Sequence, residues 1–395
     1  MAKISTDPKK IEEILSRGVA EVIEKDHLRS ALLSGRKLRV KLGIDPTSPN
    51  IHLGRTVVLR KLRAFQDLGH QIIFIIGDFT GIIGDTSDKE SERPMLSEKD
   101  IKVNMKDYFK QAFKILNPKK TETYHNSKWL SKIGFLELAR IANLFGLHEF
   151  ESREVIARRM KEGKRVSYLE LMYPLFQGYD SVKVRADVEL GGTDQRFNLL
   201  TGRHIQPLYK QRPQDILMTE LLEGTDGRKM SSSYGNVINI TDEANDMFGK
   251  VMALDDRLME HYFVLGTNLS TVDIADVLRQ SPKDAKMRLA REITALYHGT
   301  REAEQAEAEF SNVFSRGGKP ADIPVISLGA PSMALVDLLI ATKLAPSKSE
   351  ARRLIEQGAV RVNDFVKKNN YLVDIYSGKD TLIQVGPRKF VKISQ

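Results

Sequence analysis

The sequence contains no cysteine among its 395 residues. This absence excludes disulfide bonds, thiolate metal sites and cysteine nucleophiles, and it fits a reducing compartment. Long apolar runs are also missing, since the longest, residues 72–77, is far too short to span a bilayer. The amino-terminal segment is polar and contains an acid, unlike a secretory signal. We therefore expect a cytoplasmic protein with no membrane partner.

The composition that remains is that of a globular chain. Apolar residues make up 41% and charged residues 29%, which excludes a disordered chain, and the length favours two or three domains. There are 61 lysines and arginines against 52 acids, so the formal net charge is +9. This basic balance indicates a polyanionic partner.

The amino-terminal third has the pattern of an α/β protein. The first 35 residues read as a helical arm, because apolar residues recur there at helical spacing. Residues 38–44 alternate with period two and predict a strand, residues 55–68 predict a helix, and the apolar residues 71–76 predict a buried parallel strand. A strand, a helix and a strand in about 40 residues form a βαβ unit, which places the chain in the α/β class.

The rest of the chain is less regular. Residues 97–182 look mostly helical and interrupt the sheet, which residues 184–190 resume. Residues 242–313 read as helix upon helix with no convincing strand. Residues 317–331 are rich in glycine and proline and predict a linker.

A small third unit begins near residue 332. Ser347 and Glu350 form a capping-box pattern that opens a helix through Ile355. Gly358 is expected to end that helix, and residues 360–363 alternate as a strand.

The segment Pro46-Thr-Ser-Pro-Asn-Ile-His52-Leu-Gly54-Arg55 lies between a predicted strand and a predicted helix. The start of a helix offers free backbone N–H groups and a positive dipole end, both suited to an anion. Gly54 would let a ligand approach the backbone, while His52 and Arg55 can donate hydrogen bonds to phosphate. The segment therefore predicts a phosphate site, and a plain surface turn is the alternative.

A second candidate is Gly227-Arg-Lys229-Met230-Ser231-Ser232-Ser233. A small loop that carries a cation can close over phosphates and open again. A solvated hairpin tip is the alternative for this segment alone. Its place, roughly 180 residues after the first candidate in an α/β chain, favours the phosphate interpretation.

Together these segments resemble the two signature motifs of class I aminoacyl-tRNA synthetases, His-Ile-Gly-His and Lys-Met-Ser-Lys-Ser. The closer resemblance is to bacterial tyrosyl-tRNA synthetases, in the branch with Val-Lys-Leu-Gly before Asp-Pro-Thr, and it covers nearly the whole chain. Four segments match in order: Lys41-Leu-Gly-Ile-Asp45-Pro-Thr, Ile76-Gly-Asp-Phe-Thr-Gly-Ile-Ile-Gly84-Asp85, Tyr173-Pro-Leu-Phe-Gln177-Gly-Tyr-Asp180 and Gly191-Gly-Thr-Asp194-Gln195. The resemblance implies a tyrosine–tRNA ligase with a Rossmann-like doubly wound parallel sheet, an α-helical domain and a small α+β RNA-binding domain.

The resemblance implies a tyrosine site made of six polar residues: Lys41, Asp85, Tyr173, Gln177, Asp180 and Gln195. Asp85, Tyr173 and Gln177 would hold the α-ammonium, Asp180 would accept a hydrogen bond from the phenol, and Gln195 would line the pocket. The residues alone leave other interpretations open, with Asp85 as a helix N-cap, Tyr173 as a core aromatic and Asp180 as a solvated loop acid.

For ATP the resemblance implies contacts from nine residues: Gly43, Asp45, His52, Gly54, Gly192, Asp194, Lys229, Met230 and Ser232. Gly192 and Asp194 would meet the ribose, and Met230 would contact adenine mainly through its backbone. The residues implied to be catalytic lie at the phosphates: His52, Arg55, Lys229 and Ser232. ATP with Mg²⁺ is the expected substrate complex, with no prosthetic group and no protein-bound metal.

The chain departs from the family pattern at three positions. Arg55 stands where the first motif ends in histidine, and an arginine binds phosphate but is permanently charged. Ser232 replaces the second lysine of the other motif, which removes a cation from the pyrophosphate clamp. Eukaryotic and archaeal relatives with serine there are helped by a bound potassium ion, so K⁺ is a further expected ligand. Lys41 replaces a tyrosine near the phenol, as is usual in this branch.

The carboxy-terminal unit resembles the RNA-binding domain shared with ribosomal protein S-four, whose helix-turn-strand signature corresponds to residues 347–363. Residues 331–395 hold 11 lysines and arginines and 6 acids, so +5 of the +9 lies there. This concentration is typical of a domain that contacts the phosphate backbone. We expect tRNA contacts from Arg352, Arg353 and Arg361.

The expected organisation is a catalytic domain over residues 1–235 with a helical insertion at about 120–182, a helical anticodon-binding domain over 236–316, a linker over 317–331 and the RNA-binding domain over 332–395. The resemblance implies tRNA(Tyr), L-tyrosine and ATP as partners and a homodimer joined through the insertion. Two alternatives stay open: a tryptophan–tRNA ligase, and a catalytically weak paralogue that binds structured RNA.

Overall fold

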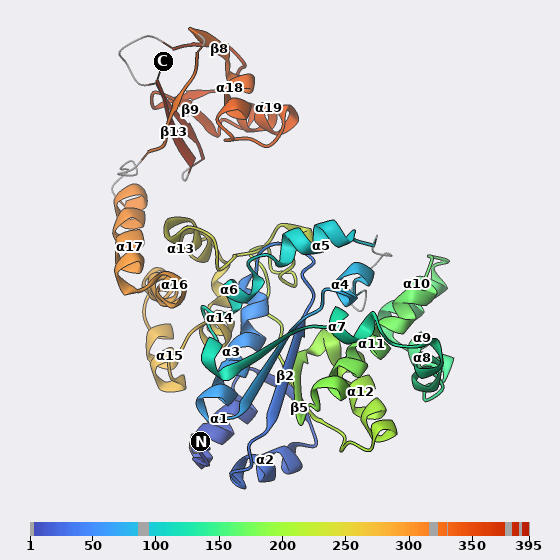
Figure 1. The fold of residues 1–395 in the computed structure, drawn as a ribbon. Coiled ribbons are helices and arrows are strands. Elements are labelled where there is room, and N and C mark those ends of the chain that lie inside the picture. The colour runs from blue at the N-terminus through green and yellow to red at the C-terminus, as the bar shows by residue number, and fades with distance from the viewer. Residues whose placement is uncertain are drawn as a thin grey trace. The chain divides into compact units, whose positions relative to one another are not determined.

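The computed structural model describes residues 4–85, 95–315, 323–329, 331–375, 381–386 and 389–394. The chain folds into two compact units, which are Met1–Glu243 with Lys250–Tyr297 and Ala244–Gly249 with His298–Gln395. Each unit has its own sheet and its own apolar core (Figure 1).

A six-stranded sheet forms the centre of the first unit. Its strands, in the spatial order β1-β6-β5-β2-β3-β4, are Val19–Ile23, Asp215–Thr219, Val188–Gly192, Arg39–Ile44, Gln71–Ile76 and Thr121–His125. Every neighbouring pair is parallel except β1 with β6. The chain leaves β2 toward β3 on one side and later returns to β5 on the other. The predicted doubly wound α/β fold is confirmed, and the carboxyl ends of β2 and β5 mark the place where such sheets bind ligands.

The predicted βαβ unit is also confirmed. The last five side chains of β3, Ile-Ile-Phe-Ile-Ile, are all buried, as expected for a parallel strand covered on both faces. The helix α3 spans Leu53–Asp67 and buries Val57, Leu62 and Phe65 along one stripe. Gly69 follows it with φ +99°, a left-handed conformation that favours glycine and ends the helix.

Helices cover both faces of this sheet, with α3 on one side and α11 and α12 on the other (Figure 1). The α-helices up to residue 298 are α1 Pro8–Ser16, α2 Lys25–Leu33, α3, α4 Thr80–Ile83, α5 Glu98–Met105, α6 Tyr108–Ala112, α7 Ser127–Leu130, α8 Phe135–Ala142, α9 Leu147–Glu151, α10 Glu154–Lys161, α11 Tyr168–Val184, α12 Arg196–Ile205, α13 Ala244–Met252, α14 Met259–Gly266, α15 Thr271–Leu278 and α16 Pro282–His298. Short 3₁₀ turns are η1 Pro118–Lys120, η2 Thr193–Gln195, η3 Gln206–Tyr209, η4 Ser232–Tyr234 and η5 Asp256–Leu258.

The first unit differs from the prediction in several details. The expected helical arm contains the strand β1, because Gly18 at φ +59° ends the helical run and the next residues pair with β6. The strand β4 lies inside the expected helical insertion and pairs in parallel with β3. The expected strand at residues 184–190 begins later, since α11 continues to Val184 and Arg185 turns the chain at φ +50°.

The second unit contains a five-stranded sheet in the order β10-β9-β12-β13-β7 and a two-stranded pair, β11 with β8. Its elements are α17 Thr300–Ser315, β7 Val325–Ser327, β8 Ser332–Ala334, α18 Leu335–Ala341, α19 Lys348–Glu356, β9 Val360–Val362, β10 Phe365–Lys367, β11 Leu372–Asp374, β12 Thr381–Val385 and β13 Lys389–Ser394. In one apolar core, the helices α18 and α19 pack against the strands of this unit.

The predicted helix and strand of this unit are confirmed. Ser347 accepts a hydrogen bond from the backbone N–H of Glu350 and so caps α19, while Gly358 follows the helix at φ +70°. The Glu350 carboxylate does not complete the capping box, because it accepts two hydrogen bonds from Arg353.

The expected linker is partly structured. β7 lies within it and pairs in parallel with β13, with Val325 opposite Lys392. Residues 317–322 and 330 of the linker lie outside the described residues.

Within the described ranges, no helix has the length and apolarity needed to cross a membrane.

Candidate active site

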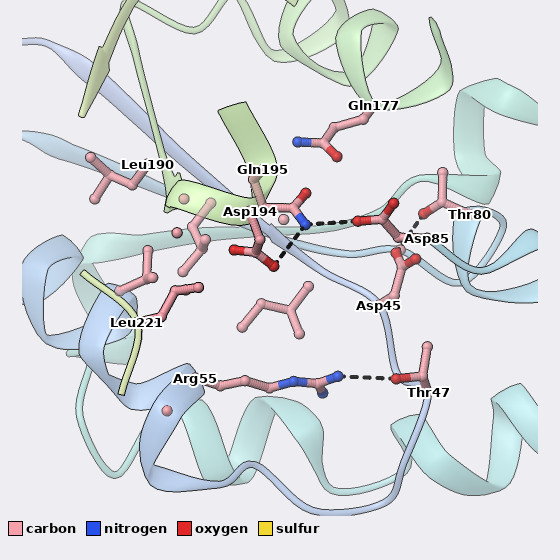
Figure 2. A pocket seen from close by; sticks show the side chains of 18 of the residues that line it. Asp45, Thr47, Arg55, Thr80, Asp85, Gln177, Leu190, Asp194, Gln195 and Leu221 are labelled. Carbon is pink, nitrogen blue, oxygen red and sulfur yellow. Dashed lines mark hydrogen bonds between the residues drawn. The ribbon is translucent and has the colours of Figure 1, made fainter. Parts of the chain in front are cut away.

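A cavity of about 260 Å³ opens where β2 and β5 end and α3 begins (Figure 2). The loop after β6 and the inner face of α11 complete its wall. The lining brings together every residue that the sequence assigned to tyrosine, ATP or catalysis, with the exception of Lys41. Side chains that lie far apart in the sequence, such as those of Thr47 and Ser232, thus share one site.

One end of the cavity is formed by the first turn of α3, whose N-cap is the buried His52. Burial, and then the charges of Arg55 and Lys229, lower the pKa of His52 to about 3. The imidazole is therefore neutral at physiological pH and has one N–H to donate. A Cβ at position 54 would lie only 3.1 Å from the His52 ring, so a larger residue would require this ring to shift by a few tenths of an ångström. The backbone N–H of Gly54 is 3.2 Å from the sulfur of Met230.

Arg55 extends from α3 along the cavity toward the loop after β2 (Figure 2). Its guanidinium donates to the hydroxyl of Thr47 at 3.0 Å and to the hydroxyl of Tyr108. Tyr108 is fully buried and in turn donates to the carbonyl oxygen of Ser48 at 2.8 Å. These contacts hold a permanent positive charge in a fixed place at the edge of the cavity.

The loop after β6 contributes the second cation of this end. Lys229 donates through its ammonium to the Asp194 carboxylate at 2.8 Å, across the cavity mouth. Met230, the next residue of this loop, is buried. The exposed Ser232 donates its hydroxyl proton to Ser48 Oγ at 3.2 Å. The loop is thereby attached both to the end of β5 and to the loop after β2.

Carboxylates dominate the opposite end of the cavity. Both oxygens of Asp45 accept hydrogen bonds, one from the Thr80 hydroxyl at 2.7 Å and one from the Tyr173 hydroxyl at 2.9 Å. Burial raises the pKa of Asp45 to about 6, and the nearby charge of Asp85 also raises it. Tyr173 is thus buried, as the core alternative requires, and still lines the cavity.

Asp85 faces Asp45 from the turn after α4 (Figure 2). It accepts a hydrogen bond from the side-chain amide of Gln195 at 2.7 Å. The same amide lies 3.4 Å from Asp194, so Gln195 connects the carboxylate end to the mouth of the cavity. Gly43 borders this region, and a side chain added there would point into open space.

Asp180 lies at the inner end of the cavity and is only 3% exposed. Its two oxygens accept hydrogen bonds from the indole N–H of Trp129 at 2.7 Å and from the amide of Asn126 at 3.1 Å. Burial raises the pKa of Asp180 to about 7, although Lys41 and these two donors lower it. The alternative of a solvated loop acid is excluded, because the residue sits within α11.

Lys41, which the resemblance assigns to the tyrosine site, lies behind the wall of the cavity. It is fully buried in β2, on the face that meets α11, and does not line the cavity. Its ammonium donates to the carbonyl oxygen of Gln177 at 3.0 Å, to the hydroxyl of Ser181 at 2.8 Å and to the Glu189 carboxylate at 2.8 Å. The lysine therefore lies directly behind the residues that line the inner end.

Sequence reasoning missed the polar residues that hold the site together: Thr80, Tyr108, Asn126, Trp129, Ser181 and Glu189. Their hydrogen-bond partners lie far from them in the sequence; Trp129 and Asp180, for example, are 51 residues apart. The sequence offered one signal for these residues, because Trp129 is the only tryptophan of the chain. In the structure this tryptophan is largely buried.

The residues assigned to tRNA lie in the second unit. Arg352 and Arg353 are on α19 and Arg361 is on β9, and all three are exposed. Arg353 is paired with Glu350 at 2.7 Å.

The cavity holds two cations, Arg55 and Lys229, the second of which is paired with Asp194, and three further carboxylates, Asp45, Asp85 and Asp180. Such an arrangement suits a ligand pair that carries phosphates at one end and an ammonium with a hydrogen-bond donor at the other. In the part of the chain that the structure describes, no group of three or more histidine or acidic residues is placed to hold a metal ion.

Comparison with known proteins gives the class first. Residues 33–315 match the family model described as "tRNA synthetases class I (W and Y)", and residues 316–391 match that of the "Tyrosine--tRNA ligase SYY-like C-terminal domain". The chain therefore belongs to the class I aminoacyl-tRNA synthetases.

The similar proteins narrow this class. A tyrosine–tRNA ligase of Moorella thermoacetica is 47% identical over 393 residues, which cover 96% of this chain and 94% of that protein. A tyrosine–tRNA ligase of Thermotoga maritima is 43% identical, with 98% of each chain covered. The chain belongs to the tyrosyl-tRNA synthetase family, and these relatives do not favour the tryptophan alternative.

Solved structures agree with this fold. A tyrosyl-tRNA synthetase of Archaeoglobus fulgidus, complexed with L-tyrosine, superposes with a TM-score of 0.61 at 22% identity and covers 76% of this chain and all of that one. A carboxy-terminally truncated mitochondrial tyrosyl-tRNA synthetase of Aspergillus nidulans gives a TM-score of 0.66 at 21% identity, over 77% of this chain and 94% of that one.

Proposed function

We propose that the protein activates L-tyrosine with ATP and transfers it to tRNA(Tyr), releasing AMP and pyrophosphate. The observation that carries this proposal is the buried Asp180 carboxylate, which Trp129 and Asn126 hold at the inner end of the cavity. A phenol that reaches this end donates to an acceptor fixed in advance. A phenylalanine cannot add this further hydrogen bond to the buried carboxylate, and the loss of a hydrogen bond to a charged group is costly. Tyrosyl-tRNA synthetases are themselves the standard example of rejection by this means.

The remaining carboxylates fit the other end of the amino acid. Asp85 offers a charged acceptor for the α-ammonium, together with the side chains of Tyr173 and Gln177. Gln195, which donates to Asp85, lines the path between the ammonium and the phosphates. Asp45 lies at the boundary of the two substrates, because its oxygens face Thr80 and Tyr173 while the adjacent loop leads to α3.

ATP, with Mg²⁺ on its phosphates as part of the substrate complex, occupies the cationic end. Gly43 and Gly192 leave room for the nucleotide, and Asp194 is the acceptor for a ribose hydroxyl. Lys229 rests on Asp194 at 2.8 Å, so binding of the ribose releases this ammonium toward the phosphates. Gly54 and the neutral His52 add uncharged donors, while Met230 and Ser232 border the nucleotide from the loop.

The first step is an in-line displacement. A tyrosine carboxylate oxygen attacks the α-phosphorus, the bond to the bridging oxygen of pyrophosphate breaks, and tyrosyl-adenylate forms. No protein nucleophile takes part, so the chain contributes positioning and stabilisation of the negative charge that builds on the phosphates. Arg55, held by Thr47 and Tyr108, and the movable Lys229 supply the positive charge. K⁺ near Ser232 is the proposed replacement for the cation that the loop lacks.

In the second step a hydroxyl of the terminal tRNA ribose attacks the tyrosyl carbonyl and AMP leaves. Arg352, Arg353 and Arg361 are exposed on the basic carboxy-terminal unit and are proposed to contact the tRNA backbone. The domain division expected from the sequence stays part of this proposal, with residues 1–235 catalytic, 236–316 binding the anticodon and 332–395 binding RNA.

We propose a homodimer that forms through the helical insertion. Large apolar side chains are exposed on α8, α9 and the start of α11, including Phe135 at 88% and Tyr168 at 78%. Neighbouring Leu136 and Leu147 are exposed as well. Surfaces of this kind mark protein–protein contacts. A cytoplasmic location fits a protein whose substrates are ATP and tRNA.

Charging of tRNA(Tyr) with radiolabelled tyrosine tests the complete reaction. Tyrosine should be attached in an ATP-dependent manner, and tRNA(Trp) with tryptophan should give no product. RNA binding without any charging would favour the alternative of an RNA-binding paralogue.

A further inference from the structure

A closed hydrogen-bond network lies behind the inner end of the cavity. Lys41 and Glu189 come from adjacent parallel strands, β2 and β5, and pair directly across the sheet at 2.8 Å. Both are essentially unexposed, at 0% and 1%. The second Glu189 oxygen accepts from Ser181 at 2.8 Å and from Gln214, so the carboxylate is fully used. Burying such a pair is costly, and nothing in the packing of a sheet against a helix requires it.

The network joins the sheet to the part of α11 that lines the cavity. Lys41 donates to the carbonyl oxygen of Gln177 and to the hydroxyl of Ser181, which lie one helical turn apart. Asp180 lies within this turn, directly before Ser181. Glu189 accepts from the Gln177 side-chain amide at 3.2 Å. The pair thus fixes both the residue proposed for the ammonium and the residue proposed for the phenol.

The charges around Asp180 are few. Lys41 on β2 and Glu189 on β5 face it from the sheet, and Tyr173 faces it from its own helix. The neutral donors Trp129 and Asn126 complete its surroundings. Asn126 also donates to Thr80, which donates to Asp45, so a second carboxyl lies at the far end of the same chain of hydrogen bonds. Lys41 is the one positive charge among these groups, and Glu189 opposes it with a smaller effect.

We propose that the Lys41–Glu189 pair is a positioning device that sets tyrosine selectivity: the charge of Lys41 keeps Asp180 in its carboxylate form, and its hydrogen bonds fix the turn of α11 that carries Asp180. Neither residue touches the substrate. The inference rests on the proposed function, because Asp180 must be the acceptor for the phenol. Without this counter-charge the Asp180 carboxylate, which is buried from solvent, would take up a proton and become a weaker hydrogen-bond acceptor.

The experiment measures kcat/KM against pH in tyrosine-dependent pyrophosphate–ATP exchange, since this ratio reports groups of the free enzyme. For the native enzyme we expect kcat/KM to rise with pH through a midpoint near the pKa of Asp180, which is about 7. Lys41→Met should move that midpoint upward by about 1 unit or more, as expected for loss of a nearby opposite charge. Glu189→Gln should move it downward. Opposite shifts from two partners of one pair are not expected from structural damage.

Trp129 gives a readout that needs no activity. It is the only tryptophan of the chain, and its indole donates directly to Asp180, so its emission should titrate with that carboxyl. The same opposite shifts should be seen in the full-length enzyme without substrates. Arg39→Met is the matched control, because Arg39 lies on the same strand and pairs with Glu122 at 2.9 Å, away from Asp180. It should leave both midpoints unchanged.

Shifts of equal sign in Lys41→Met and Glu189→Gln, or no shift of the Trp129 titration in either, would overturn the inference. If Lys41→Met does not fold, the downward shift in Glu189→Gln decides alone. Absence of tyrosine-dependent exchange in the native enzyme would contradict the proposed function instead, and the fluorescence titration would still test the pair.

Discussion

Asp180 and Asp85 both line the cavity, yet their surroundings give them different tasks. Asp180 meets only neutral donors at the inner end, whereas Asp85 faces Gln195 and the open part of the site. Asp180→Asn keeps the shape but removes the charged acceptor for the phenol. We expect a loss of preference for tyrosine over phenylalanine of about 1.5–3 kcal/mol, the usual contribution of a hydrogen bond to a charged group. Exchange kinetics with both amino acids measure it.

Asp85→Ala provides the comparison for that variant. It removes the partner of the ammonium, which every amino acid carries, so tyrosine and phenylalanine should weaken alike. An equal loss of both substrates in Asp180→Asn would contradict the assignment of Asp180 to the phenol.

Lys229 is expected to act late in the reaction. In the structure it rests on Asp194, and it reaches the phosphates as the ribose takes that carboxylate. Lys229→Ala should therefore lower kcat by about 100-fold or more while the KM for tyrosine changes little. Arg228→Ala is the control, because Arg228 bonds Asp226 at 2.7 Å and does not line the cavity. A silent Lys229→Ala variant would exclude the loop as a pyrophosphate clamp.

Among the elements, the loop that contains Ser232 carries a serine where the resemblance implies a second lysine. Ser232 contacts Ser48, a neutral partner, instead of adding a charge. We expect exchange activity to rise with K⁺ at constant ionic strength, and Ser232→Lys to abolish this dependence. Equal rates in K⁺ and in a larger organic cation would mean that Arg55 and Lys229 suffice.

The helices of the insertion are expected to form the dimer contact. Phe135→Glu on α8 places a charge in the exposed apolar surface and should convert a dimer into a monomer in light scattering at micromolar concentration. Val272→Glu on α15 is the matched control, since Val272 is 70% exposed outside the insertion. A native enzyme that already has the mass of one chain would contradict the dimer.

Element prediction succeeded where burial leaves a strong pattern. β3 is apolar at five consecutive buried positions, and its identity is readable. β4, Thr-Glu-Thr-Tyr-His, is a polar edge strand that no alternation reveals, and its pairing with β3 decides its conformation. The strand β6 was not predicted. It has only five residues, directly after a loop, and these are too few to show a clear strand pattern in the sequence.

The residues of the site, like the strands, were predictable only where the local sequence carries a clear pattern. Residues within motifs, such as His52 and Asp194, could be assigned because their neighbours in sequence define them. Trp129 and Glu189 could not, because their importance lies in contacts with Asp180 and Lys41 that only the folded chain makes.

At the scale of the whole molecule, the basic carboxy-terminal part should be separable from the chemistry. β7 pairs with β13, so a truncation must precede β7, and α17 ends at Ser315. A chain of residues 1–315 retains every residue of the cavity. We expect it to form tyrosyl-adenylate at nearly the full rate and to charge tRNA poorly.

Salt dependence separates lost contacts from a damaged fold. Each phosphate contact contributes about 0.7 to 0.9 to the slope of log K against log salt, so loss of three should reduce the slope by about 2 to 3. The full-length variant with Arg352, Arg353 and Arg361 changed to alanine should reproduce this reduction. An unchanged slope in both proteins would place the tRNA contacts elsewhere.

The central claim is that this cavity activates tyrosine, and pyrophosphate–ATP exchange with each of the twenty amino acids tests it most directly. The structure predicts exchange with tyrosine far above all others, because its phenol hydroxyl can donate a further hydrogen bond to the buried Asp180 carboxylate that lines the cavity. Phenylalanine should be the nearest competitor in shape and should remain weak. Exchange that is strongest with tryptophan, or absent with all twenty, would contradict the account.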